Sequence, residues 1–191
     1  MELKQYQQAV LDDLALYIDI LKEQRSNHKA FSTYWRQKGI TLQQGEETFH
    51  PYCDTMSGAP NMTIKVPTAG GKTFIACNAI QTIFDKMPQN LTKVVAWFVP
   101  SDTILKQTYE NLRNPQHPYR QRIDTLFNGR VEVYDKQALL FGQNFNPTII
   151  KEQLSIFVLS IQSFATKATD KRLVYNENEN LAEFTKTYTP D

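Results

Sequence analysis

The residues whose types and spacing most clearly suit a chemical function form one run, residues 66–73. Gly70 and Gly71 let the backbone bend tightly and approach anionic oxygens, so that the amides that follow can point into one phosphate-binding concavity. The ammonium of Lys72 can reach the β- and γ-phosphates of a nucleotide, and the hydroxyl of Thr73 is a suitable ligand for Mg²⁺. The run therefore predicts a phosphate-binding loop.

This loop departs from the usual pattern, G-x-x-x-x-G-K-[ST], at its first position, where Val66 replaces glycine. The alternative is an ordinary glycine turn before a lysine, but a strand-like run before the loop and a helical run after it favour nucleotide binding. We expect Lys72 and Thr73 to act in catalysis, with Thr73 on the metal. The residues expected to hold the nucleotide are Pro67, Thr68, Ala69, Gly70, Gly71, Lys72 and Thr73.

Strands and helices must alternate around such a loop to position it. Residues 62–66 form a short strand-like run, and the apolar residues of 72–86 recur at helical spacing. The run at 94–99 is β-branched and aromatic, which predicts a strand buried on both faces. Further strands are expected over 131–134 and 156–159, and further helices after Ser101, over 119–127 and over 149–154. This alternation predicts an α/β fold whose parallel sheet is covered by helices.

The chain is expected to divide into four parts. An amphipathic helix occupies residues 1–24, and an irregular insertion with one short helix around 31–38 occupies residues 25–60. A partial nucleotide-binding domain follows over 61–170. The polar segment 171–191 ends the chain, and we expect the domain to be truncated there.

Composition limits the class of protein. The 191 residues are 41% apolar and 21% charged with a net charge of +1, which is typical of a globular protein and neither identifies nor excludes a nucleic-acid binder. No apolar run approaches the about 18 residues that span a bilayer, and the N-terminus lacks a signal-peptide pattern, so we expect a cytoplasmic protein without membrane contact. Cys53 and Cys77 form no C-x-x-C pair, and His50 near Cys53 is too small a set for a metal site.

Four segments, in this order, carry a family resemblance. Residues 3–7, Leu-Lys-Gln-Tyr-Gln, are similar to L-x-x-Y-Q, and residues 67–73 are similar to the loop P-T-G-S-G-K-T. Residues 99–107 resemble P-[TS]-x-x-L-x-x-Q with one extra residue before the leucine, and residues 159–164 resemble T-x-Q-S-[FL]. These are motifs of superfamily 2 helicases and translocases of the DEAD/DEAH type. Within that group the chain looks most like the Res subunit of type III restriction enzymes.

The resemblance implies a three-layer RecA-like domain that binds ATP and Mg²⁺ and belongs to a motor on DNA. It implies that Gln7 recognises adenine, whose paired edge suits an amide with both a donor and an acceptor. It also implies that Ser101, Gln162 and Ser163 contact the nucleic-acid backbone. The resemblance further implies a protein partner, the modification or specificity subunit of a restriction system.

The acidic pair of such motors, D-E-x-H, does not follow the loop in this sequence. Its aspartate would hold Mg²⁺ and its glutamate would orient the attacking water. Asp135 ends a strand-like run, but Lys136 follows it, so we do not expect Asp135 to be the magnesium ligand. We therefore expect weak nucleotide binding and poor hydrolysis by this chain alone.

Two other functions remain open from the sequence. A phosphate-loop kinase would leave the segments at 99–107 and 159–164 unexplained. A non-catalytic nucleotide-binding module would fit the missing acidic pair.

Overall fold

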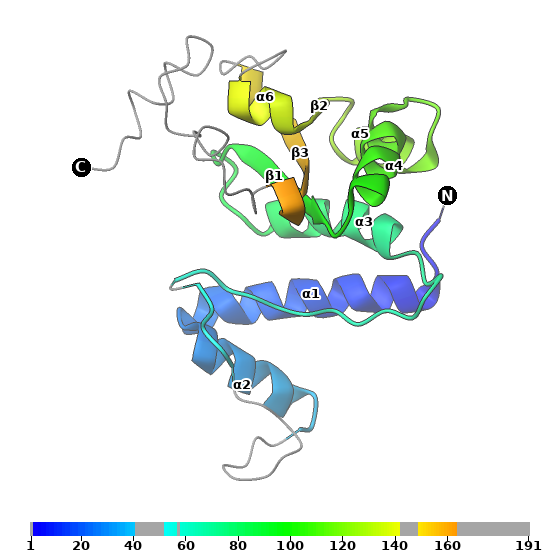
Figure 1. Cartoon of the computed structure of the whole chain (residues 1–191). Helices are drawn as coiled ribbons and strands as arrows, with labels where there is room; N and C mark the ends of the chain where they lie inside the picture. Colours follow the sequence, from blue (N-terminus) through cyan, green and yellow to red (C-terminus); the bar gives the residue numbers. More distant parts are fainter. Residues whose placement is uncertain (1, 41–51, 57, 142–148, 164–191) are drawn as a thin grey trace, which may run out of the picture. The chain divides into compact units, whose positions relative to one another are not determined.

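The computed structural model describes residues 2–40, 52–56, 58–141 and 149–163, without the side chains of residues 139–141 and 163. These residues form two compact units, one up to residue 88 and one from residue 89 onward (Figure 1). The expected polar segment 171–191 and residues 41–51 of the expected insertion lie outside the described residues. The four-part division therefore stays a prediction.

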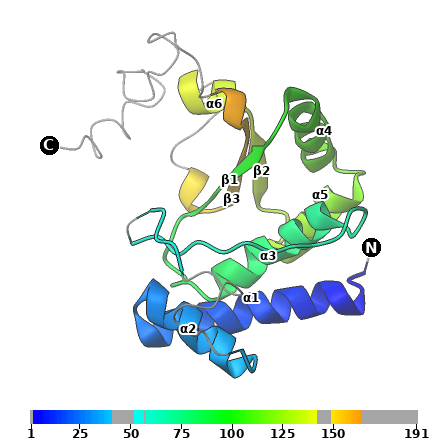
Figure 2. The same cartoon turned by 60° about the horizontal axis from the view of Figure 1, so that its bottom comes forward.

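The first unit is built from three helices, α1 (Gln5–Gln24), α2 (Asn27–Gln37) and α3 (Lys72–Asp85). α1 packs against both α2 and α3, as Figure 2 shows. Its buried face repeats at three- and four-residue steps through Gln7, Leu11 and Leu14, as in an amphipathic helix. α2 begins earlier than expected because Ser26 caps it, the Ser26 hydroxyl accepting from the Lys29 amide at 3.4 Å.

The strand expected over residues 62–66 is wrong. No strand is formed there, and Met62 and Ile64 are 41% and 44% exposed. The alternating pattern of these residues indicated an extended backbone with one apolar face, but a strand also needs a hydrogen-bonded neighbour. The segment instead runs along α1 and α2, where Met62, Thr63 and Ile64 line a cavity with residues of both helices.

The second unit holds a parallel sheet of β1 (Lys93–Val99), β2 (Val131–Tyr134) and β3 (Leu154–Ser160) in the order β1-β3-β2. Val99 pairs with Ser160 at the end of β1, and Val131 pairs with Leu154 at the start of β2. The central strand β3 is buried at every residue. The α/β fold with a parallel sheet and flanking helices is confirmed, and the strands expected over 94–99, 131–134 and 156–159 are present.

The helices of the second unit are α4 (Asp102–Arg113), α5 (Pro118–Leu126) and α6 (Lys136–Phe141), with short 3₁₀ turns at Ile149–Lys151 and Ile161–Ser163. Both α4 and α6 contact β2 and β3, and α5 packs on α4. The helix expected over 149–154 is wrong, since one 3₁₀ turn there leads directly into β3. Within the described part of the chain, no helix has the length and apolar character needed to cross a membrane.

The expectation that the 94–99 run is buried on both faces is also wrong. Val94, Ala96 and Phe98 are exposed, Val94 and Phe98 at 43% and 51%, whereas Val95 and Trp97 are half-buried. β1 has β3 as its one neighbour in the described sheet and therefore lies at its edge. The central place that the sequence pattern suggested belongs to β3.

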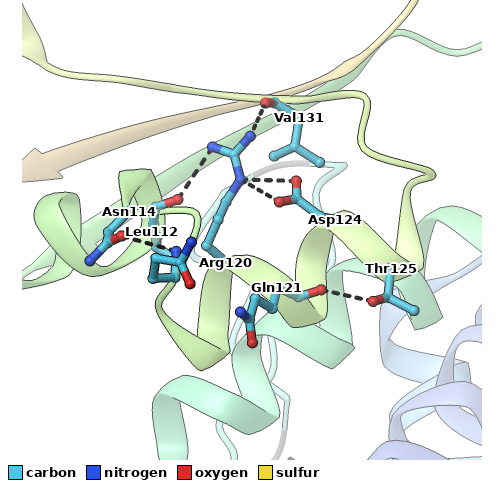
Figure 3. Close-up of polar contacts among 8 residues, drawn as sticks. Leu112, Asn114, Arg120, Gln121, Asp124, Thr125 and Val131 are labelled. Atoms are coloured by element: carbon cyan, nitrogen blue, oxygen red, sulfur yellow. Dashed lines mark hydrogen bonds and ion pairs between the residues drawn. The ribbon is translucent and has the colours of Figure 1, made fainter.

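An arginine on α5 links three elements of the second unit through hydrogen bonds (Figure 3). Arg120 donates from Nε to both carboxylate oxygens of Asp124 at 2.9 Å and from Nη2 to the Val131 carbonyl at 2.8 Å. Its Nη1 also donates to the Leu112 carbonyl at 3.4 Å. One planar guanidinium thus joins the end of α4, the body of α5 and the start of β2.

Candidate nucleotide-binding site

The phosphate-binding loop lies between the extended segment 61–66 and the start of α3. The Pro67 carbonyl accepts from the Gly70 amide and from the Lys72 ammonium, both at 3.0 Å. Ala69 and Gly71 take the left-handed conformation, with φ of 61° and 72°. Alternation of handedness along a short loop turns successive amides toward one side, which is the geometry of an anion-binding nest.

Space favours glycine at both positions 70 and 71, and the left-handed backbone favours it at position 71 as well. A Cβ at Gly70 would lie 2.6 Å from the Val66 Cγ1 atom and 2.9 Å from the Pro67 carbonyl oxygen. A Cβ at Gly71 would lie 2.6 Å from the Gln7 Nε2 atom. Val66, which breaks the usual pattern at the first position, therefore occupies space beside Gly70 that a side chain there would need.

Two residues of α1 hold the loop from outside. The Tyr6 hydroxyl donates to the Gly70 carbonyl at 2.8 Å, and Gln7 Nε2 donates to the same carbonyl at 3.1 Å. Gln7 Oε1 accepts from the Lys4 amide at 3.0 Å, so the side chain spans the start of α1 and the loop. Gln7 is 5% exposed, unlike its neighbour Gln8, which is exposed and bonds Asp12.

Tyr6 was not among the residues expected to act at the site. The L-x-x-Y-Q segment contains it, but the pattern gives no sign that its hydroxyl reaches a loop 64 residues away. Recognition of adenine by Gln7 stays a prediction. The amide already makes two hydrogen bonds to the protein, and a primary amide has one further N–H and a further lone pair available for a ligand.

The residues present fit the triphosphate of a nucleotide. Gly71 caps α3 and Lys72 and Thr73 are its first residues, so the unpaired amides of the first turn face the loop. The first turn contains no acidic residue that would repel a phosphate. Lys72 is exposed and Thr73 is half-buried. The lysine is held by one hydrogen bond to Pro67, which a phosphate oxygen can replace.

Thr73 is the candidate that the loop itself offers for Mg²⁺. Among the described residues there is no group of three or more His, Cys, Asp or Glu that could hold a metal ion. Asp135 follows β2 and its carboxylate accepts from the Ala138 amide at 3.0 Å, so it caps α6. That Asp135 is not the magnesium ligand stays a prediction.

The cysteines have different surroundings. Cys53 is exposed and Cys77 is buried in α3, and both are free thiols. Burial raises the pKa of the Cys77 thiol to about 12, which makes it a poor nucleophile. His50 lies outside the described residues.

Two of the three residues expected to contact nucleic acid come to one edge of the sheet. Val99 and Ser160 are paired at the carboxyl ends of β1 and β3, and Ser101 and Gln162 each follow two residues later. The Ser101 hydroxyl accepts from the Ile104 amide at 3.4 Å and thus caps α4, and Gln162 is exposed. The side chain of Ser163 lies outside the described residues.

These features define a class of protein, a phosphate-loop nucleotide-binding protein with an α/β fold. A sequence model of the family described as "Type III restriction enzyme, res subunit" matches residues 1–187, and the chain belongs to this family. The matched region is a helicase-like, ATP-binding domain, which implies a RecA-like fold. Neither the curated proteins nor the solved structures include a match to this chain.

Proposed function

We propose that this chain is the ATP-binding N-terminal part of an ATP-dependent DNA helicase or translocase, the Res subunit of a type III restriction enzyme. The observation that carries the proposal is the loop at residues 66–73, which Tyr6 and Gln7 of α1 hold through the Gly70 carbonyl. Family membership supports a helicase-like protein over a phosphate-loop kinase. The proposed partners are DNA and a modification or specificity subunit, and the proposed compartment is the cytoplasm.

In this proposal the loop binds the phosphates of ATP and α1 binds the base. Residues 67–73 provide amides to the phosphates, Lys72 neutralises the β- and γ-phosphates, and Thr73 ligates Mg²⁺. When bound, Mg²⁺ and ATP supply the charge and the transferable phosphoryl group for hydrolysis. Gln7 recognises the adenine edge with its remaining N–H and lone pair.

DNA is proposed to contact the carboxyl edge of the sheet. Ser101 follows β1 and Gln162 and Ser163 follow β3, so their segments lie on neighbouring strand ends. The amides at the start of α4 can bind a phosphate of the strand. Asp102 at the first position of α4 opposes this contact, because its carboxylate repels a phosphate.

Binding of a fluorescent ATP analogue with Mg²⁺ tests the nucleotide site. We expect Lys72→Ala to abolish binding, because it removes the one side-chain cation in the loop. Lys86→Ala is the matched control, since Lys86 lies at the other end of α3 and pairs with Asp19 at 2.5 Å. Equal binding by the original chain and Lys72→Ala would contradict the proposal.

A comparison of ATP with GTP tests the role of Gln7. If Gln7 recognises adenine, Gln7→Ala weakens ATP binding more than GTP binding, because both nucleotides lose the support of the loop but ATP alone also loses the base contact. If it serves only to hold the Gly70 carbonyl, both nucleotides lose affinity equally. Gln8→Ala, one residue further along the same helix but exposed, is expected to change neither.

A further inference from the structure

A cavity of about 360 Å³ lies in the first unit, apart from the phosphate-binding loop. It is lined by α1, α2 and the extended segment 61–65 and is open to solvent, and neither Gln7 nor any residue from 66 to 73 lines it. Its volume is within the range of roughly 300–1,000 Å³ that is typical of small-ligand sites. The nucleotide-binding function described above gives this cavity no role.

Four aromatic rings line this cavity, from Tyr17, Phe31, Tyr34 and Trp35. Tyr17 and Tyr34 meet edge to face with centroids 5.5 Å apart, and Tyr34 and Trp35 do so at 5.1 Å. Aromatic rings present flat faces against which another planar ring can pack. A flat guest ring can therefore lie against one of these walls, as a base does.

The charges around the cavity favour an anionic ligand. The charged lining residues are Asp13 and Lys65, and Asp13 is already paired with Lys38, whose ammonium lies 5.7 Å from the centroid of the Tyr34 ring. Two lysines and one aspartate leave a net charge of +1 at this site. A planar ring that carries a nearby phosphate is complementary to this combination.

The aromatic walls and the positive charge together select one class of ligand. The flat rings suit a planar base, and Lys65 at the rim suits the phosphate beside it.

We propose that this cavity binds an unstacked nucleobase of a single-stranded nucleic acid, with Trp35 as the stacking surface and Lys65 on the adjacent phosphate. The inference rests on the proposed function in one respect, namely that the partner is a nucleic acid. It does not require ATP, because the cavity and the loop share no residue.

Tryptophan fluorescence tests the site in the full chain without nucleotide. Trp35 and Trp97 are the two tryptophans, so Trp97→Phe leaves Trp35 as the reporter. We expect a single-stranded oligothymidylate to quench Trp35, and an abasic strand of the same length, which has phosphates but no bases, to leave it unquenched. Absence of quenching by oligothymidylate, or equal quenching by the abasic strand, would overturn the proposal.

Anisotropy of a labelled oligothymidylate gives the affinities of variants. Trp35→Ala is expected to weaken binding by about 5- to 150-fold, the usual range for loss of one base-stacking residue. Lys65→Gln, an exposed change that preserves the fold, is expected to reduce the slope of log affinity against log salt by about 0.7. Lys29→Gln, exposed on the other side of α2, is the control and should leave affinity and slope unchanged.

Two further measurements distinguish a strand from a free nucleoside and this cavity from the nucleotide site. Thymidine should quench Trp35 far more weakly than the strand, and equal affinity for both would overturn the assignment to a strand. Lys72→Ala should leave the quenching by oligothymidylate intact, so that failure of the nucleotide site and failure of this site are distinguishable. Loss of strand binding in Lys72→Ala would overturn the proposed independence of the cavity.

Discussion

The contact between Gly71 and Gln7 yields a prediction that can be worked out in free energy. Gly71→Ala places a Cβ 2.6 Å from Gln7 Nε2 while φ is 72°. The left-handed backbone costs a residue with a Cβ roughly 1–2 kcal/mol. Displacement of the Gln7 amide from the Gly70 carbonyl costs about 1 kcal/mol more. We therefore expect Gly71→Ala to lower the free energy of unfolding of the first unit by about 2–3 kcal/mol.

Gly39 provides the matched control. Its φ is 77°, and a Cβ there would meet nothing within 4 Å. Gly39→Ala should therefore show the backbone cost alone, roughly 1–2 kcal/mol. In a Gln7→Ala background the side chain that obstructs residue 71 is gone. Gly71→Ala should then lower the free energy of unfolding by the same amount as Gly39→Ala. The two changes at positions 7 and 71 should thus be coupled by about 1 kcal/mol.

Urea unfolding measures these values. The Trp97→Phe chain leaves Trp35 of α2 as the fluorescent reporter, and α2 belongs to the unit that contains positions 7, 39 and 71. If Gly71→Ala is no more destabilising than Gly39→Ala, or if the double variant with Gln7→Ala is additive, then the amide of Gln7 does not sit against the loop as described.

Three further outcomes are expected. Ala69→Gly should raise the stability of the loop by up to about 1 kcal/mol, since φ at Ala69 is 61°; a urea midpoint below that of the original chain would contradict this. Arg120→Lys should destabilise the second unit by about 1–3 kcal/mol in thermal unfolding, because an ammonium cannot bond Asp124, Val131 and Leu112 together; an unchanged midpoint would refute it. Burial holds the pKa of the Cys77 thiol at about 12 against an ordinary 9.0, so the stability that it contributes is complete below pH 9 and is lost as pH rises toward 12. Cys77→Ala should flatten stability over that pH window, and a thiol reagent at neutral pH should label Cys53 in the native chain before Cys77.

The local chemistry of the loop was predictable from sequence, whereas its supports were not. Glycine, lysine and threonine in the G-K-T order carry their own geometry, because the glycines permit the bend and α3 starts at the lysine. The bond from Tyr6 to Gly70 joins residues 64 positions apart and depends on how α1 packs. No spacing rule within either segment encodes that contact.

The fold shows the same limit. β-branched runs predicted three strands because each carries its propensity locally. Which of them lies at the centre depends on pairing, and the more aromatic run of β1 turned out to be at the edge. Met62, Ile64 and Val66 alternate as a strand would, but alternation reports an extended backbone and not the presence of a partner strand.

The proximity of Val66 and Gly70 has a consequence for sequence variation in this family. The similar loop P-T-G-S-G-K-T carries serine where this chain has Gly70, and here the Val66 methyl group is only 2.6 Å from the place of that side chain. The two positions therefore share one fixed volume, which either a valine at 66 or a side chain at 70 can fill. Homologues with serine at the position of Gly70 should carry a residue smaller than valine at the position of Val66. The two positions should therefore covary across the family, even though neither residue bonds a nucleotide through its side chain.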